Sequence, residues 1–160
     1  MNELIELLKR HGLTISSVES FTGGLFGSRL SEIPGVSEVY RGTLTAYSES
    51  VKSEWLDLEP IWLHSVGTIS ADCAKAMAIQ GRLHFHSDVC VALTGNAGPS
   101  ALENQPVGQW FACIALGERL IEISRIDHLE RNALRQHAVD EVTAVIVKAL
   151  REVDTTRIHP

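Results

Sequence analysis

The hydrophobic pattern of the chain changes repeatedly between helical and strand spacing. Asn2 is a candidate N-cap, Ser70 is predicted to cap a helix, and Gly12 is a C-terminal stop signal. Stretch 57–67 contains Pro60 and is predicted to be a loop with a single helical turn. Five segments are predicted to be helical: 2–11, 25–33, 48–56, 70–83 and 131–150.

Strands are predicted in five other segments: 13–18, 39–47, 88–93, 107–116 and 120–125. Segment 88–93 is apolar almost throughout, as expected of a strand buried on both faces, and Gly117-Glu118 has the length of a hairpin turn. Because helices separate most strands, we expect one three-layer α/β/α domain around a mixed, mostly parallel sheet of about five strands. Residues 1–153 are assigned to this domain, and the tail 154–160 is expected to be disordered.

Composition and charge narrow the classes of function. The 160 residues carry a net charge of −6 and no basic run longer than Lys9-Arg10, so we expect no nucleic-acid partner. No apolar run reaches the roughly 18 residues of a membrane helix, and the amphipathic start of the chain is unlike a signal peptide. We therefore expect a cytoplasmic protein without a membrane partner. A phosphorylated small molecule remains compatible, because one or two arginines and backbone N–H groups suffice to bind it.

The cysteines and histidines show no metal-binding pattern. Cys73, Cys90 and Cys113 lie in apolar surroundings without paired spacing, which favours free buried thiols in a reducing compartment. His84 and His86 lie near Asp88, but histidines two residues apart arise easily by chance in a chain with seven. We expect neither a metal nor a cofactor.

The first candidate site is the turn 19–24, which follows a predicted strand. In open α/β sheets, ligands bind beyond the carboxyl ends of strands. The Ser20 hydroxyl, followed by Gly23 and Gly24 before a helix, would lie beside unpaired N–H groups that can bind an anion or an oxyanion. The alternative is an ordinary N-cap and turn.

The second candidate is the segment Tyr47–Lys52. If a helix begins near Ser48, Lys52 lies one turn further along the same face. A lysine in a dry site can lose its proton near neutral pH and act as a base toward a hydroxyl. The alternative is a solvated surface lysine.

Two weaker candidates complete the set. The turn-rich loop 94–99 follows a buried strand and either wraps a ligand or reverses the chain. Arg131 and Arg135 lie one turn apart at the start of the last predicted helix, a spacing that suits a phosphate but also an ordinary solvated face.

Together these segments resemble the CinA C-terminal domain, also seen as the stand-alone nicotinamide-nucleotide amidohydrolase. The resemblance covers residues 3–150 with the motifs in order. The family motifs AESCTGG, YSNEAK, GAVS, ITGIAGP and KPVGTVW correspond to Val18–Gly24, Tyr47–Lys52, Gly67–Ser70, Leu93–Pro99 and Gln105–Trp110.

The resemblance implies hydrolysis of the carboxamide of nicotinamide mononucleotide to the acid and ammonia, without a metal. Carried over by motif, Ser20 is the nucleophile, Lys52 the base and Tyr47 an assisting hydroxyl, with N–H groups around Thr22 and Gly23 facing the oxyanion. The resemblance also implies self-association, for which the sequence shows no interface. The implied substrate contacts are Thr22, Gly23, Gly24, Ser48, Thr94, Gly95, Ala97, Gly98, Arg131 and Arg135. Arg135 is the first candidate to face the phosphate and Arg131 the second.

Departures from the family pattern keep a second interpretation open. Phe21 replaces a cysteine, Asn96 replaces an isoleucine, and Leu129-Glu130-Arg131 replaces Gly-Asp-Arg. The family has a run of glycines followed by Ser-Glu-Glu-Lys where this chain has residues 100–105, which contain neither glycine nor lysine. Loss of glycines threatens close approach of backbone to a ligand. The chain can therefore also be a catalytically silent module that binds a ligand or a partner. Whether Phe21 fills the pocket beside Ser20 or points into the core discriminates between the two.

Overall fold

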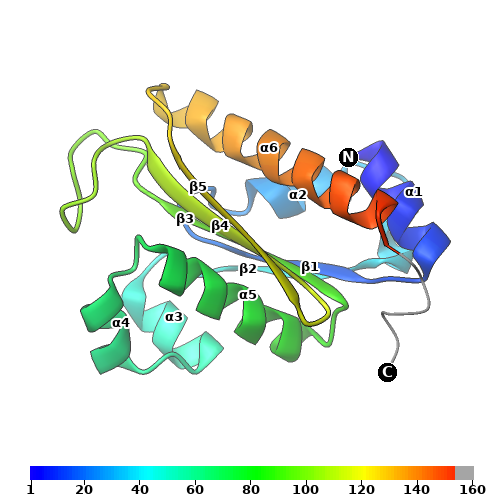
Figure 1. Cartoon of the computed structure of the whole chain (residues 1–160), viewed down its shortest axis with the longest axis horizontal. Coiled ribbons are helices and arrows are strands. Elements are labelled where there is room, and N and C mark those ends of the chain that lie inside the picture. The colour runs from blue at the N-terminus through cyan, green and yellow to red at the C-terminus, as the bar shows by residue number, and fades with distance from the viewer. Residues whose placement is uncertain (154–160) are drawn as a thin grey trace.

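The computed structural model describes residues 1–153, in which a five-stranded sheet lies between two layers of helices (Figure 1). The predicted disordered tail, 154–160, lies outside the described residues. The strands are β1 (Ile15–Glu19), β2 (Tyr40–Thr45), β3 (Val89–Gly95), β4 (Gln109–Leu116) and β5 (Arg119–Ile126). The helices are α1 (Asn2–His11), α2 (Leu25–Ser31), the 3-10 turn η1 (Val36–Glu38), α3 (Glu49–Leu56), α4 (Pro60–Val66), α5 (Ala71–Phe85) and α6 (Arg131–Arg151).

The strand order across the sheet is β2-β1-β3-β4-β5. β1 pairs in parallel with both β2 and β3, β4 is antiparallel to β3, and β5 is antiparallel to β4. All strands except β4 therefore run in the same direction, and the predicted mixed sheet with one antiparallel hairpin is confirmed. The carboxyl ends of β1, β2 and β3 meet at one edge.

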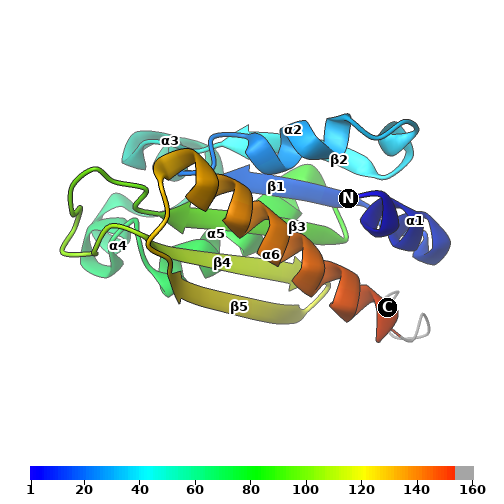
Figure 2. The ribbon, with the colours of Figure 1, turned by 90° about the horizontal axis from the view of Figure 1, so that it is seen from above.

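The two faces of the sheet are covered by different helices (Figures 1 and 2). α1, α2 and α6 cover one face, and α3, α4 and α5 cover the other. Residues of β3 alternate between the two cores: Val89, Val91 and Leu93 belong to the larger core beneath α6, whereas Cys90 and Ala92 belong to the smaller core above α5. Because both faces of β3 are buried, side chains pointing to either face must be apolar. This explains why segment 88–93 has no polar residue after Asp88.

The central strand β1 is fully buried although it contains three polar residues. Ser16 and Ser87 share a hydrogen bond between their hydroxyls at 2.7 Å, and the Ser17 hydroxyl bonds to that of Thr43 on β2. Burial of a polar group costs free energy unless it is hydrogen-bonded, and these pairs satisfy that requirement. These hydrogen bonds allow the polar residues of β1 to be buried in the interior.

Some predicted boundaries were wrong. α1 has Met1 rather than Asn2 at its N-cap. The segment expected to be a loop with one turn contains the seven-residue helix α4, because Pro60 occupies the first helical position, where its missing N–H costs nothing. None of the helices within residues 1–153 is long and apolar enough to cross a membrane.

The three cysteines are free and buried, as predicted. Burial raises the pKa of the Cys90 thiol to about 12 and those of Cys73 and Cys113 to about 11. Thiols in such surroundings remain protonated and behave as small apolar side chains. The cysteines therefore contribute packing rather than nucleophiles.

Gly81 lets α5 approach the sheet closely. A Cβ built at Gly81 would lie 2.4 Å from Val18 Cγ2 and 2.7 Å from Cys90 Sγ, closer than real Cβ contacts come. The residue is buried between the helix and the two central strands. α5 can therefore lie this close to the sheet only because Gly81 has no side chain.

We expect Gly81→Ala to lower the free energy of unfolding by about 1–3 kcal/mol, because the added methyl group overpacks this contact. The better helix propensity of alanine, worth about 1 kcal/mol, offsets only part of the loss. Urea denaturation measures the change. Gln80→Ala, on the preceding residue of the same helix, serves as the control and should stay within about 0.5 kcal/mol of the parent. Equal stability of Gly81→Ala and the parent would contradict the close approach.

Candidate active site

The candidate active site lies at the edge where β1, β2 and β3 end. The Ser20 amide donates to the carbonyl of Leu93 at 2.9 Å, and the Ala46 amide donates to the carbonyl of Glu19 at 2.8 Å. These bonds continue the parallel ladders one residue past the strands. They bring the turn after β1 and the segment after β2 side by side.

The side chains of Ser20 and Lys52 meet at this edge. The Lys52 Nζ lies 3.2 Å from the Ser20 Oγ and donates a second hydrogen bond to the carbonyl of Ala46 at 2.8 Å. Lys52 is only 1% exposed. Ser48 caps α3 through its side chain, which accepts from the amide of Val51, so the predicted helix start places Lys52 one turn inward. Lys52 is therefore not a solvated surface lysine.

The surroundings of Lys52 favour its neutral form. Burial lowers the pKa of the Lys52 amine from its ordinary value, while the negative charges of Glu103 and Glu49 act in the opposite direction. Burial is the larger effect, because a buried ammonium loses its hydration. A neutral amine beside a serine hydroxyl can accept its proton and so activate it as a nucleophile.

A buried carboxylate, which the sequence reasoning did not single out, holds the turn after β1. Glu19 is fully buried, and its side chain accepts hydrogen bonds from the amides of Phe26 at 3.1 Å and Gly27 at 2.9 Å. These are N–H groups of the first turn of α2 that lack helical partners. A carboxylate at this position also suits the positive end of the helix dipole. The sequence signal that could have identified this role is a glutamate placed shortly before the glycine-rich start of a helix.

The turn itself changes the expected set of oxyanion donors. The Gly23 amide donates to the Ser20 carbonyl at 2.9 Å, so it is engaged within the turn and is not available as predicted. Within residues 1–153, the amides of Phe21, Thr22 and Gly24 have no hydrogen-bond partner. Gly23 and Gly24 have φ of 61° and 89°, a conformation that only glycine adopts without strain. The amides that remain available near Ser20 are therefore those of Phe21, Thr22 and Gly24.

Arg135 holds the same turn from outside. Its Nε and Nη2 both donate to the Thr22 carbonyl, at 3.2 and 2.7 Å, and its Nη1 donates to Asn132 Oδ1 at 3.1 Å. The guanidinium therefore fixes the turn instead of standing free for a phosphate. Thr22 is fully buried, and its Oγ1 has no partner within the described chain.

Arg131 links two loops at the mouth of the site. It donates to the Tyr47 hydroxyl at 3.0 Å and to the Gly98 carbonyl. Tyr47 is 59% exposed, and its hydroxyl bonds to Arg131 rather than to Ser20 or Lys52. The structure thus brings Tyr47, Gly98 and Arg131 together as a second group beside the Ser20–Lys52 pair.

Phe21 points into the core. It is 5% exposed, belongs to the core beneath α6, and its ring centroid lies 6.5 Å from that of Trp110. The large side chain therefore occupies the hydrophobic core beneath α6 and not the side of the turn on which Ser20 meets Lys52. The replacement of the family's cysteine is therefore accommodated by packing.

Asn96 organises the loop that departs from the family pattern. Its Nδ2 donates to the carbonyls of Ser100 at 3.0 Å and Gln105 at 3.2 Å, and its Oδ1 accepts from the Gly98 amide at 2.9 Å. Asn96 is 1% exposed. The three hydrogen bonds of the Asn96 side chain hold this loop in one conformation, although it lacks the glycines of the family.

Glu103, at the tip of this loop, is bound to the segment before α5. Its carboxylate accepts from the amides of Thr68 at 2.7 Å and Ile69 at 3.1 Å, and from the Thr68 hydroxyl. Beside it lies an open cavity of about 420 Å³, lined among others by Glu49, His64 and Asn104. The loop therefore closes one side of a cavity whose lining shares Glu49 and Glu103 with the surroundings of Lys52.

Three of the predicted substrate contacts, Thr94, Gly95 and Ala97, make contacts within the protein. Thr94 donates its hydroxyl to the Thr68 carbonyl at 2.6 Å. A Cβ at Gly95 would lie 2.6 Å from Trp110 Cβ, so glycine is needed there for the pairing of β3 with β4. Ala97 packs against the core beneath α6.

The His84, His86 and Asp88 side chains do not converge. His84 pairs with Asp57 at 3.0 Å, His86 is the C-cap of α5, and the Asp88 carboxylate accepts from Thr14.

Comparisons with known proteins agree with this architecture. The family model of the CinA C-terminal domain matches residues 1–150. "Protein MG115 homolog" from Mycoplasma pneumoniae is 35% identical over 151 residues, 94% of this chain and 96% of that protein. A "CinA-like protein" from Pseudothermotoga lettingae is 39% identical over 149 residues, 92% of this chain but only 36% of that longer protein. The competence damage-inducible protein A (ComA) of Klebsiella pneumoniae subsp. pneumoniae has the same fold, with a TM-score of 0.92, 19% identity and 96% of both chains covered.

We expect Asn96→Ala to loosen the loop 97–105, because three backbone groups lose their partner at a cost of about 1–3 kcal/mol for each group left buried and unpaired. Hydrogen exchange of the Gly98 amide measures this directly and should accelerate. Ser100→Ala, which changes an exposed side chain in the same loop, is the control and should leave the exchange rate unchanged. Unchanged protection of Gly98 in Asn96→Ala would show that the loop is held by other contacts.

Proposed function

The chain belongs to the CinA C-terminal domain family, and we propose that it is an amidohydrolase that releases ammonia from the carboxamide of nicotinamide mononucleotide. The observation that carries the proposal is the buried Lys52 Nζ, 3.2 Å from the Ser20 Oγ at the carboxyl edge of the sheet. Burial lowers the pKa of Lys52, and a lysine that gives up its proton more readily suits the role of base toward such a serine.

The reaction follows from these two groups. Neutral Lys52 accepts the hydroxyl proton of Ser20 while its own N–H remains bound to the Ala46 carbonyl. The Ser20 Oγ then attacks the carboxamide carbon, and the resulting oxyanion returns its electron pair as the C–N bond breaks. The Lys52 ammonium donates its proton to the leaving nitrogen, which departs as ammonia. Lys52, neutral again, activates the water that hydrolyses the ester on Ser20.

The oxyanion needs hydrogen-bond donors that are not already engaged. The amides of Phe21, Thr22 and Gly24 meet this condition, whereas the Gly23 amide does not. Arg135 and Glu19 fix the turn from two sides, so these amides need no reorganisation during the reaction. We assign the oxyanion to this turn.

The phosphate and ribose are assigned to the mouth of the site. Arg131 is exposed and keeps its guanidinium between Tyr47 and Gly98, whereas Arg135 is fully engaged with protein. Arg131 is therefore the better candidate for the phosphate. Tyr47, being exposed, is assigned to substrate contact at this mouth rather than to proton transfer at Ser20.

The position of Phe21 favours the hydrolase over a catalytically silent binding module. Its ring packs against Trp110 in the core beneath α6 and does not lie between Ser20 and Lys52. The altered loop is held by Asn96 and Glu103, so its lost glycines are replaced by specific contacts. Both departures that suggested inactivity thus have structural explanations.

We expect ammonia release from nicotinamide mononucleotide by the unmodified protein, and a loss of about a thousandfold or more in Ser20→Ala and in Lys52→Ala. A glutamate dehydrogenase-coupled assay measures the ammonia, and circular dichroism verifies folding. Lys75→Ala, which removes a half-exposed lysine of α5, is the control and should retain full activity. No ammonia from the folded parent across several carboxamide nucleotides would overturn the proposal.

We expect Glu103→Gln to move the acid limb of the kcat/KM profile to lower pH. The Glu103 charge raises the pKa of Lys52, so its removal lowers that pKa and enlarges the neutral, active fraction at a given acidic pH. The measurement is the pH dependence of kcat/KM. Glu54→Gln, on the exposed side of α3, is the control and should leave the limb in place. A shift to higher pH would contradict the role of Lys52 as base.

A further inference from the structure

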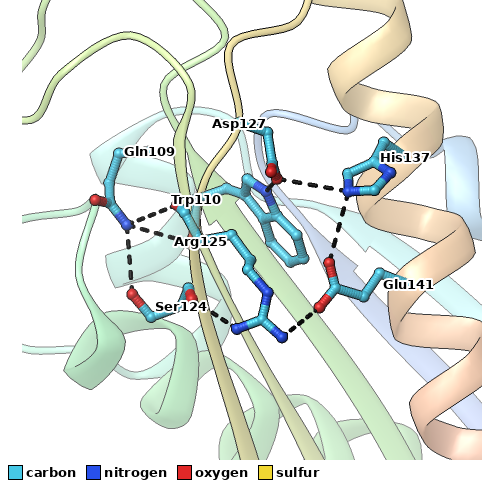
Figure 3. A network of polar contacts seen from close by, with 7 residues as sticks. All are labelled: Gln109, Trp110, Ser124, Arg125, Asp127, His137 and Glu141. Carbon is cyan, nitrogen blue, oxygen red and sulfur yellow. Dashed lines mark hydrogen bonds and ion pairs between the residues drawn. The ribbon is translucent and has the colours of Figure 1, made fainter.

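A second cluster of chemically active side chains lies between β5 and α6, outside the Ser20–Lys52 site (Figure 3). Asp127 follows β5 directly, and His137 and Glu141 lie one turn apart on α6, facing it. One ligand atom from each of the three side chains lies within 4.8 Å of the others. The cluster joins residues that are distant in sequence and carries no role in the proposed hydrolysis.

The distances within the cluster suit coordination better than hydrogen bonding. His137 Nε2 lies 3.6 Å from Asp127 Oδ2 and 3.7 Å from Glu141 Oε2. Both distances exceed those of a hydrogen bond. Ligand atoms about 2.1 Å from a tetrahedral ion are about 3.4 Å apart, so small side-chain rotations would bring all three onto one ion. Within residues 1–153, neither ring nitrogen of His137 has a hydrogen-bond partner.

Neighbouring groups orient both carboxylates. The buried Trp110 donates its Nε1 to Asp127 Oδ2 at 2.7 Å, and Arg125 binds Glu141 Oε1 at 2.6 Å, leaving Oε2 toward His137 (Figure 3). Such outer contacts are typical of metal-binding carboxylates. The carboxylate side chains are 25% and 20% exposed and His137 is 45% exposed, so an ion has an open approach and room for water ligands.

We propose that Asp127, His137 and Glu141 bind a divalent transition-metal ion of the Zn²⁺ type. One imidazole and two carboxylates suit Zn²⁺, Co²⁺ or Ni²⁺, whereas Mg²⁺ and Ca²⁺ prefer oxygen ligands alone. The two carboxylates supply negative charge to the ion, although that of Glu141 is shared with the Arg125 guanidinium. It would join the end of β5 to the helix that carries Arg131 and Arg135, so it acts as a clamp on α6 and takes no step in hydrolysis.

The site can be tested on the full, untagged chain after chelator treatment, by titration with ZnCl₂ in a calorimeter. We expect one high-affinity equivalent in the parent and at least a tenfold loss of affinity in His137→Ala and in Asp127→Asn. His84→Ala is the matched control, because His84 is similarly exposed and pairs with a single carboxylate, Asp57. It should bind Zn²⁺ like the parent.

A Co²⁺ titration separates binding from folding effects. The visible d–d absorption of bound Co²⁺ should appear in the parent and in His84→Ala and should be absent from His137→Ala, with all three proteins folded. Absence of a high-affinity equivalent in the parent would overturn the proposal and leave His137 as a partner of two carboxylates only. Equal Zn²⁺ affinity in the parent and in His137→Ala would also overturn it. None of these outcomes depends on amidohydrolase activity.

Discussion

The buried carboxylate of Glu19 is the interaction on which the arrangement of the site depends. It joins the end of the central strand to the start of α2 through two backbone amides, and it accepts a third bond from Ser17. Ser17 in turn bonds to Thr43, and Thr43 to Tyr40. A carboxylate without these donors would be too costly to bury at this depth. Satisfying it therefore requires β1, β2 and α2 to adopt one relative position, and the turn carrying Ser20 lies where they meet.

The last helix completes this arrangement from the opposite direction. Arg131 and Arg135 reach the loop mouth and the Ser20 turn, and one to two turns later His137 and Glu141 face the end of β5. α6 thus contacts the Ser20 turn near its first residues and crosses one face of the sheet along its length (Figure 2). Motion of this helix relative to the sheet would change both groups of contacts together.

The order of elements could be predicted because apolar spacing reports local structure, and the parallel connections limit how those elements can be arranged. The Ser20–Lys52 pair could be predicted only through the resemblance of the two motifs to the family, because the residues alone left Lys52 open as a solvated surface lysine. Contacts made by α6 could not be predicted, since Arg135 and Thr22 are 113 residues apart and meet only through the angle at which the helix crosses the sheet. α4 was missed because proline was weighed as a helix breaker rather than as a first-turn residue.

The inward orientation of Phe21 has a consequence for how paralogues are sorted into active and inactive enzymes. A residue adjacent to a nucleophile usually counts as part of its signature, and a change there as evidence of decay. In this chain that position belongs to the hydrophobic interior, where the Phe21 ring lies beside Trp110. The volume available beneath α6 therefore accommodates a large side chain next to Ser20. A bulky residue at this position is not by itself evidence against turnover.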